Sequence, residues 1–237
     1  ANLSTKTLLK DVSFQLHRGE ILGFAGLMGA GRTETARAVI GADPRSAGTI
    51  RINGRDAKIH QPEDAVRRGV GYLSEDRKQL GLMLEDVTFN TVLASLSNYA
   101  GALGWMGDGK AKSQTKQYVE QLRVKTPSVN QIVKLLSGGN QQKVVIARWL
   151  MRDCEILIFD EPTRGIDVGA KEEIYRLMQQ LADAGKSIIV ISSELPEILR
   201  VANRIAVFAN GRITGTLRNE EASQEKIMQL AAHGEED

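Results

Sequence analysis

Residues 21–33 read Ile-Leu-Gly-Phe-Ala-Gly-Leu-Met-Gly-Ala-Gly-Arg-Thr, a short apolar run followed directly by a cluster of glycines. The run Ile21–Ala25 is typical of a buried strand, and Arg32–Ile40 predicts a helix that ends at Gly41. A glycine-rich turn between a strand and a helix offers backbone N–H groups and the positive end of the helix dipole to an anion. This segment therefore predicts a phosphate-binding loop, made by Gly26, Leu27, Met28, Gly29, Ala30, Gly31, Arg32 and Thr33.

Two positions of this loop bear on its chemistry. Thr33 offers a hydroxyl that would bind Mg²⁺ beside the phosphates, as in the pattern G-x4-G-K-[ST]. Arg32 stands where that pattern has lysine, and its planar guanidinium keeps the positive charge but is not interchangeable with an ammonium. Taken alone, the loop is also compatible with an ordinary glycine-rich turn that binds nothing.

The chain on both sides of this loop alternates between strand and helix patterns. We expect strands at Val12–Leu16, Ile21–Ala25, Gly48–Gly54, Val70–Leu73, Ile156–Phe159, Ser187–Ser192, Arg204–Phe208 and Arg212–Leu217. We expect helices at Arg32–Ile40, Pro62–Arg68, Asp86–Asn98, Lys110–Lys125, Ser137–Met151, Val168–Ala184 and Glu194–Val201. The dipeptide Asn210-Gly211 predicts that the last two strands form a hairpin.

This order of elements predicts an α/β fold. Strands that alternate with helices imply a mostly parallel sheet covered on both faces, and the first strands add an N-terminal antiparallel β portion. The region of about 76–151 is mostly helical in pattern and reads as an inserted subdomain. We therefore expect a single domain with a core at about 1–75 and 152–237 and a helical subdomain at about 76–151.

The composition argues against several classes of protein. The 237 residues carry a formal net charge of +2 with scattered basic residues, which does not suit a nucleic-acid-binding surface. The single cysteine, Cys154, cannot form an internal disulfide, as expected for a protein of a reducing cytosol. No apolar run reaches the roughly 18 residues that a membrane-spanning helix needs. We therefore expect any membrane role to come through a partner.

Two further segments narrow the function. Residues 136–143, Leu-Ser-Gly-Gly-Asn-Gln-Gln-Lys, open a predicted helix with a serine and two glycines. Residues 156–163, Ile-Leu-Ile-Phe-Asp-Glu-Pro-Thr, form an apolar strand that ends in paired carboxylates. With the glycine-rich loop, these motifs resemble the ABC ATPase family over essentially the whole chain. The resemblance implies the P-loop NTPase fold of an ABC cassette, an ATP-hydrolysing activity, and ATP and Mg²⁺ as ligands.

The resemblance also implies roles for individual residues. Asp160 would hold Mg²⁺ together with Thr33, directly or through water, and Glu161 would activate the attacking water as a general base. The Leu-Ser-Gly-Gly signature would act in trans, where a helix N-terminus covers the γ-phosphate of ATP bound to a facing cassette. Asp167 would lie in the loop that crosses between the two cassettes. The signature residues are Ser137, Gly138, Gly139, Asn140 and Gln141.

A closer resemblance is to the second cassette of ribose-, galactose- and xylose-type importer ATPases. It rests on Glu-Asp-Arg-Lys at 75–78, Gly-Arg-Thr at 31–33, Gly-Gly-Asn-Gln-Gln-Lys at 138–143 and Pro-Thr-Arg-Gly-Ile-Asp-Val-Gly-Ala at 162–170. Those proteins carry two cassettes in one polypeptide, and the start at Ala1 without an initiator methionine fits an excised C-terminal half.

This closer resemblance implies the partners and the location of the chain. The partners are an N-terminal cassette of the same polypeptide, integral-membrane permease subunits and, indirectly, a periplasmic sugar-binding protein, but no nucleic acid. The location is the cytoplasmic face of the inner membrane, where the chain binds through the permease. We expect the permease contact near residues 75–84, at Leu80, Leu82, Met83 and Leu84.

Four departures from the family pattern predict a weak nucleotide site. Arg32 replaces the P-loop lysine, Glu75 stands where a glutamine senses the γ-phosphate, and Ser193 stands where a switch histidine contacts it. No aromatic residue precedes Phe14 to stack on adenine. Loss of a donor aimed at transition-state charge typically costs ~10²–10³ in rate. We therefore expect this site to bind ATP and hydrolyse it poorly, while the signature serves the partner cassette.

Three other functions stay open at this point. The chain could keep full activity despite these departures, or it could be a non-hydrolytic nucleotide-binding module whose value lies in dimerisation. It could also be an ABC ATPase that acts on nucleic acid, which the neutral charge disfavours.

Overall fold

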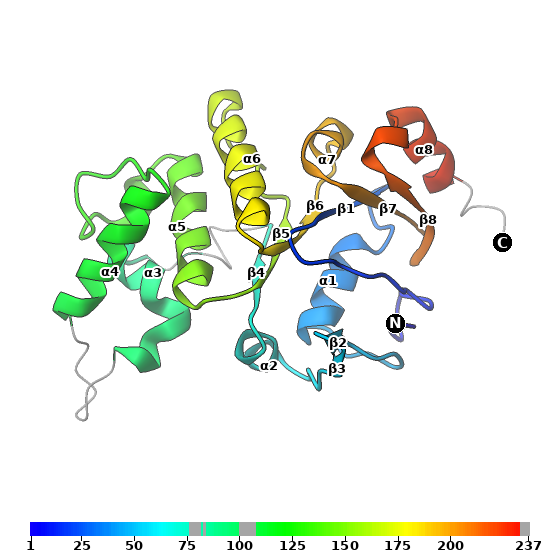
Figure 1. The fold of residues 1–237 in the computed structure, drawn as a ribbon, viewed down its shortest axis with the longest axis horizontal. Helices are drawn as coiled ribbons and strands as arrows, with labels where there is room; N and C mark the ends of the chain where they lie inside the picture. Colours follow the sequence, from blue (N-terminus) through cyan, green and yellow to red (C-terminus); the bar gives the residue numbers. More distant parts are fainter. Residues whose placement is uncertain (76–81, 83, 100–107, 233–237) are drawn as a thin grey trace. The chain divides into compact units, whose positions relative to one another are not determined.

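The structure is a computed structural model that describes residues 1–75, 82, 84–99 and 108–232. The chain divides into two compact units (Figure 1). The core unit comprises Ala1–Tyr72, Glu155–Glu161 and Met178–Asp237, and the helical unit comprises Leu73–Cys154 and Pro162–Leu177. The helical unit thus includes residues 162–177, which the sequence assigned to the core.

A six-stranded sheet with the order β4-β5-β6-β1-β7-β8 forms the centre of the core unit. Its strands are β1 (Ile21–Gly26), β4 (Val70–Leu73), β5 (Ile156–Asp160), β6 (Ser187–Ile191), β7 (Arg204–Ala209) and β8 (Arg212–Arg218). Strand β1 pairs parallel with β6 and β7, β5 pairs parallel with β6, and β8 returns antiparallel to β7. These strands follow the predicted ranges closely, because nearly continuous apolar runs are typical of strands covered on both faces.

The helices of the core unit cover both faces of this sheet (Figure 1). Helix α1 lies on one face, and α7 and α8 lie on the other. The helices are α1 (Arg32–Ile40), α2 (Pro62–Arg67), α7 (Leu195–Val201) and α8 (Gln224–Ala232), and η4 (Asn219–Glu221) is a 3-10 turn. Phe24 of β1 packs between Phe14 and Phe208 with ring centroids 5.2 and 4.8 Å away, which places the main apolar cluster around β1.

The N-terminal antiparallel portion is smaller than predicted. The expected strand Val12–Leu16 is wrong, since this segment makes only an isolated bridge between Val12 and Leu3. Its alternating pattern arises because Val12, Phe14 and Leu16 pack on the core cluster without a partner strand. The expected strand at 48–54 is shorter, and β2 (Arg51–Ile52) turns at Asn53-Gly54 into β3 (Arg55–Asp56).

The described part of the helical unit contains short helices and the first part of α6. They are α3 (Val87–Val92), η2 (Leu93–Asn98), α4 (Asp108–Gln121), η3 (Val133–Leu135), α5 (Gly138–Met151) and α6 (Val168–Asp183). The predicted helix Asp86–Asn98 is α-helical only as far as Val92, and the 3-10 segment η2 that follows contains a kink at Ser95 (φ −129°). Arg148 of α5 is buried and donates from Nε to the backbone oxygen of Asn90 at 2.8 Å, and burial lowers its pKa to about 10.

A partly buried ion pair joins the start of β1 to the start of β7. Arg204 donates from Nε to Glu20 Oε1 at 2.5 Å and from Nη2 to Glu20 Oε2 at 3.1 Å. The backbone N–H of His17 donates to the same carboxylate at 2.7 Å. Burial raises the pKa of the Glu20 carboxyl, but the hydrogen bonds from Arg204 and His17 outweigh this and leave the pKa below its ordinary value.

We predict that Glu20→Gln lowers the free energy of unfolding at pH 7 by about 1.5–3 kcal/mol, the range for a hydrogen bond to a charged group. A carboxyl whose pKa is lower in the folded chain stabilises it above the unfolded pKa, and this effect disappears as the pH falls through the folded pKa. Urea unfolding at pH 7 and at about pH 3 should therefore show the two proteins converging in acid.

The matched control is Glu63→Gln, because Glu63 is exposed in the first turn of α2. A stability difference between wild type and Glu20→Gln that is as large in acid as at pH 7 would contradict the ionic role of Glu20.

Candidate functional site

The predicted phosphate loop connects β1 directly to α1 (Figure 1). Gly31 is the N-cap of α1 with φ 106°, and no side chain caps this helix end. Gly26 has φ 146°, and a Cβ atom there would lie 2.4 Å from the backbone oxygen of Phe208 in β7. Leu27 and Met28 reach the surface, where Met28 is 95% exposed, while Ala30 is buried. The loop thus presents an uncapped helix N-terminus, which is the feature that favours an anion.

Asp160, at the end of β5, holds hydrogen bonds from two other elements of the core unit. Thr33 Oγ1 donates to Asp160 Oδ1 at 3.1 Å, and the Tyr72 hydroxyl donates to Asp160 Oδ2 at 2.7 Å. The Asp160 side chain is only 1% exposed. Burial raises its pKa, although the hydrogen bonds from Tyr72 and Thr33 and the charge of Arg32 act in the opposite direction.

The adjacent oxygens of Thr33 and Asp160 fit the ligand preference of Mg²⁺, which takes one or two carboxylates and completes its shell with water and phosphate oxygens. Among the described residues, no three His, Cys, Asp or Glu side chains gather closely enough to form a metal site of their own. A Mg²⁺ ion held by Thr33 and Asp160 would take its remaining ligands from water and from the phosphates of a bound compound.

Glu161 follows Asp160 in an unusual backbone conformation. Its φ is 47°, and its N–H donates to the backbone oxygen of Ile191 at 2.9 Å. Such a conformation costs a non-glycine residue about 1–3 kcal/mol and is common at functional sites. Burial raises the pKa of the Glu161 carboxyl, while a 3.2 Å hydrogen bond from Ser193 Oγ and the charge of Arg32 partly offset this. A raised pKa suits a group that accepts a proton.

Arg32 is directed into the core unit and is only 8% exposed. Its Nη1 donates to the backbone oxygen of Ser192 at 2.7 Å. Burial lowers the pKa of this guanidinium, and the charges of Glu161 and Asp160 oppose that effect. Ser192 is itself held in place, since its hydroxyl donates to Glu197 at 2.8 Å. The cation of the loop is therefore anchored to the segment that contains Ser193.

The predicted signature residues lie in the helical unit, around the start of α5. Ser137 is the N-cap, but its Oγ accepts a 2.8 Å hydrogen bond from Asn140 Nδ2 and does not cap the helix. Asn140 Oδ1 accepts a further hydrogen bond, at 2.8 Å, from the backbone N–H of Lys125. A hollow of about 340 Å³ opens at this helix end, and it is lined by Lys125, Ser137, Gly139, Asn140, Asp167, Gly169, Ala170 and Glu173.

The structure thus brings the predicted residues together in two separate sets. One set, in the core unit, contains the loop 26–33, Asp160, Glu161 and Ser193. The other, in the helical unit, contains Asp167 and the signature, with Gly138 as the first helical residue of α5.

Two predicted residues of the helical unit have specific protein partners. Gln141 is buried and donates to the backbone oxygen of Leu136 at 3.0 Å, which directs its amide toward the preceding segment. Glu75 forms an ion pair with Arg164.

The residues predicted to contact a permease are only partly described. Leu84 is 76% exposed and Leu82 is half-buried, while Leu80 and Met83 lie outside the described residues.

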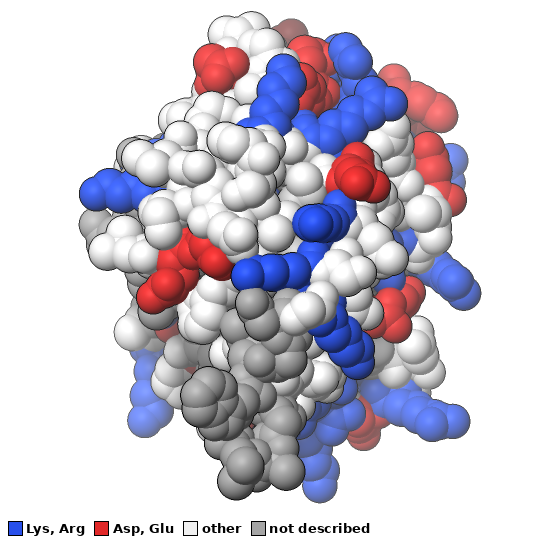
Figure 2. Space-filling view, turned by 90° about the vertical axis from the view of Figure 1, so that its left-hand side faces the viewer, with Lys and Arg blue, Asp and Glu red and all other residues white. Residues whose placement is uncertain are grey.

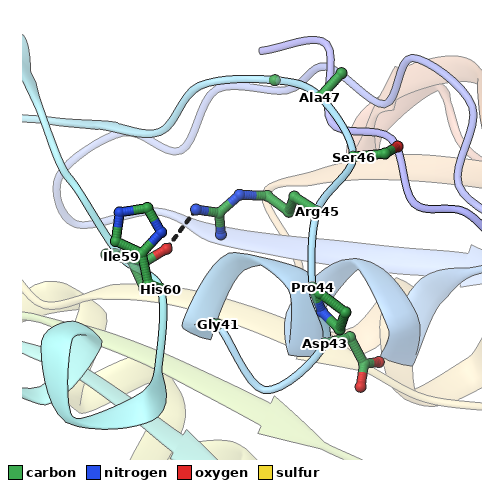
Figure 3. A pocket seen from close by; sticks show the side chains of 9 residues that line it. Gly41, Asp43, Pro44, Arg45, Ser46, Ala47, Ile59 and His60 are labelled. Atoms are coloured by element: carbon green, nitrogen blue, oxygen red, sulfur yellow. Dashed lines mark hydrogen bonds between the residues drawn. The ribbon is translucent and has the colours of Figure 1, made fainter.

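A second hollow, of about 310 Å³, lies between residues 41–48 and residues 59–60 and contains none of the predicted residues (Figure 3). Arg45 extends across it and donates to the backbone oxygens of Ala38, at 2.5 Å, and Ile59. Burial lowers the pKa of this guanidinium. Since Arg45 joins the end of α1 to the segment before α2, we assign it a structural role.

Among the residues that sequence reasoning missed, Tyr72 and Arg164 contact predicted residues through their side chains. Tyr72 is a polar residue near the end of β4, and β4 is the sheet neighbour of the strand that ends in Asp160. That position was a usable signal, because side chains at the ends of adjacent strands lie close together. Arg164 had no comparable signal, since its partner Glu75 is far away in the sequence.

The sequence of the chain is similar to a protein family and to curated import ATP-binding proteins. A family model described as ABC transporter matches residues 9–164. A putative ribose/galactose/methyl galactoside import ATP-binding protein 1 of Burkholderia lata is 60% identical over 98% of this chain and 46% of that protein. Ribose import ATP-binding protein RbsA of Clostridium tetani is 49% identical over 97% of this chain and 46% of that protein. The chain therefore spans about half the length of these curated relatives.

Solved structures share the fold. An ATP-binding cassette of an ABC transporter in its ADP conformation has a TM-score of 0.78 at 19% identity, over 98% of this chain and 92% of that one. A dimeric cassette bound to ADP and Pi has a TM-score of 0.76 at 21% identity, over 92% of this chain and 96% of that one.

We predict that Gly26→Ala and Gly29→Ala differ in cost, although both glycines have positive φ (146° and 78°). A positive φ of this kind costs an alanine about 1–3 kcal/mol at either position. Position 29 has open space around its Cβ, whereas at position 26 the Cβ meets the backbone of β7. This overpacking should add about 1–3 kcal/mol at position 26, measurable by urea unfolding. Equal costs would show that the approach of β7 does not constrain the loop.

Proposed function

Because the chain belongs to the ABC transporter family, we propose that it is an ATP-binding cassette that couples ATP binding and hydrolysis to the import of a sugar. The names of its relatives, ribose or ribose/galactose/methyl galactoside import ATP-binding proteins, support a monosaccharide as the cargo. One structural observation carries the proposal: Thr33 of the loop and Asp160 of β5 are hydrogen-bonded, with Glu161 next in the chain.

The residues of the core unit have complementary roles in this proposal. Backbone N–H groups of the loop 26–33 and the N-terminus of α1 bind the phosphates of ATP. Thr33 and Asp160 hold Mg²⁺, which when bound neutralises phosphate charge. Glu161 accepts the proton of the attacking water, and its half-buried position, which raises its pKa, favours that role.

We further propose that this chain's own site hydrolyses ATP slowly. Three contacts support this, because each engages a group that would otherwise be available to the nucleotide or the water. Arg32 donates to the backbone oxygen of Ser192, and Ser193 donates to Glu161 from the place of the switch histidine. Glu75 is paired with Arg164. Loss of one donor to transition-state charge typically costs ~10²–10³ in rate.

The hollow at the start of α5 supports a role in trans for the signature. It is formed by Ser137 and Gly139 together with Asp167, and a helix N-terminus favours an incoming phosphate. Since the chain spans about half the length of its relatives, the facing cassette is proposed to be the N-terminal half of the same polypeptide. In this arrangement the signature closes the active site of that N-terminal cassette.

The permease subunits and, indirectly, a periplasmic sugar-binding protein are the other proposed partners. No helix in the described parts of the chain combines the length and the apolar character needed to cross a bilayer. The proposed location is the cytoplasmic face of the inner membrane, through the permease. The exposed side chain of Leu84 supports the proposed contact near residues 75–84.

Other functions have less support. Nucleic-acid binding favours a basic patch, but on the face shown in Figure 2 Lys and Arg are interspersed with Asp and Glu. A non-hydrolytic nucleotide-binding module is the second candidate, and the engagement of Arg32 with Ser192 favours it. Comparing the ATPase rate of this chain alone with that of the two-cassette protein separates this candidate from a transport motor.

We predict losses of very different size for two substitutions in the two-cassette protein. Gly138→Asp places a carboxylate at the start of α5 against the γ-phosphate of the partner's ATP, so transport-coupled hydrolysis should almost vanish. Glu161→Gln removes the base only from this chain's slow site, so total turnover should fall by less than about half, although a base is typically worth ~10²–10⁴ in a fast site.

Steady-state ATPase assays at saturating ATP, with the sugar-binding protein present, measure both effects. If Glu161→Gln abolishes turnover as completely as Gly138→Asp while ATP still binds, this chain's site is needed for catalysis and the proposed asymmetry is wrong.

A further inference from the structure

Tyr72 is a tyrosine of β4 whose hydroxyl is directed at the carboxylate of Asp160. It is half-buried, and its hydroxyl donates to Oδ2 at 2.7 Å. A phenol with its ordinary pKa near 10 is protonated at neutral pH, so Tyr72 is the donor in this contact.

The two oxygens of Asp160 have different donors from different elements. Oδ2 is occupied by Tyr72 of β4, and Oδ1 is hydrogen-bonded to Thr33 of α1 at 3.1 Å. Thr33 uses its hydrogen in this contact, so the lone pairs of its oxygen are free for a cation. Because Asp160 is 1% exposed, bulk water cannot easily replace Tyr72 as the partner of Oδ2. Only Oδ1 therefore lies beside the other proposed metal ligand.

The number of carboxylate oxygens offered to a cation distinguishes Mg²⁺ from Ca²⁺. Mg²⁺ demands near-octahedral geometry at about 2.0–2.1 Å, whereas Ca²⁺ takes about 6–8 oxygens and accepts both oxygens of one carboxylate. A carboxylate that cannot turn both oxygens toward one ion therefore favours Mg²⁺.

We propose that Tyr72 is a positioning residue that holds Asp160 as a one-oxygen ligand and thereby gives the nucleotide site its preference for Mg²⁺ over Ca²⁺. This inference rests on the proposed function, because it requires that Thr33 and Asp160 hold the metal of a bound nucleotide. It adds a residue that acts through Asp160 and touches neither the metal nor the phosphates.

The test compares wild type, Tyr72→Phe and the control Tyr118→Phe, all as the full chain. Tyr118 also donates its hydroxyl to an oxygen, the backbone oxygen of Leu150 in the helical unit, so both variants lose one phenol hydrogen bond. The readout is the rise in melting temperature caused by a fixed ATP concentration during titration with Mg²⁺ or with Ca²⁺. All variants are measured at the same ATP concentration, so the binding of each metal to free ATP affects every variant equally. A difference between variants therefore reflects the protein site.

In Tyr72→Phe, the Mg²⁺ concentration for half of the effect should rise about 10- to 100-fold, the usual result of removing a group that orients a metal ligand. The Ca²⁺ concentration that gives half of the effect should change much less. The ratio of the two concentrations, which expresses the preference for Mg²⁺, should therefore fall by about tenfold or more. Tyr118→Phe should keep the wild-type ratio. The melting temperature without ligand, and the effect of ATP in EDTA, show that each variant is folded and retains its phosphate loop.

Three results would overturn the inference. An unchanged ratio of the two metals in Tyr72→Phe, with metal-dependent ATP binding in wild type, overturns it and leaves the proposed function intact. Equal weakening of both metals assigns Tyr72 a purely structural role. Absence of any metal-dependent effect of ATP in wild type overturns this inference and the proposed nucleotide site together.

Discussion

The buried carboxylate of Asp160 is the constraint on which the core unit depends. A carboxylate that is 1% exposed costs several kcal/mol unless hydrogen bonds and opposite charge compensate it. The compensation comes from separate elements, since Tyr72 belongs to β4 and Thr33 belongs to α1. The sheet order β4-β5-β6-β1 places β5 beside β4 and separates it from β1 by a single strand. The order of the strands is therefore what allows the phosphate loop and the carboxylate to meet.

Arg32 links this carboxylate to the proposed asymmetry. Arg32 stands where other phosphate loops have lysine, and it is buried. Its positive charge compensates the negative charges of Asp160 and Glu161. A guanidinium has several donors in a rigid plane, so binding the backbone oxygen of Ser192 fixes the orientation of the whole group. The contact with Ser192 thus reduces the freedom of the cation to follow a phosphate, while the charge of Arg32 compensates the carboxylates of Asp160 and Glu161. In this account, a slow site follows from the way in which the core unit satisfies its own charges.

Much of the fold could be predicted because its signals are local. Strands such as β1, β5 and β6 are nearly continuous apolar runs, and α1 begins and ends at glycines with positive φ. The segment Val12–Leu16 alternates as a strand does, but an alternating pattern also fits an extended segment that packs without a partner. Helix α8 was missed, although its apolar residues, such as the fully buried Ile227, pack on the core unit.

In the candidate site, too, the contacts that follow from local motifs could be predicted and the long-range contacts could not. The pairing of Thr33 with Asp160 follows from two motifs at the ends of strands. The contact of Arg32 with Ser192 joins residues 160 positions apart, and no local pattern specifies it.

The most direct test of the account is a single-turnover experiment on the two-cassette protein loaded with two equivalents of ATP. Quenching at successive times gives the fraction of bound nucleotide that remains ATP. If this chain's site is slow, one equivalent is hydrolysed at the rate of transport-coupled turnover while the other persists at least ~10² times longer, as expected for a site that lacks a transition-state donor. Thr33→Ala should remove the persistent equivalent, which assigns it to this chain. Loss of both equivalents at the same rate would show that the two nucleotide sites are equally active and that this chain's site is not slow.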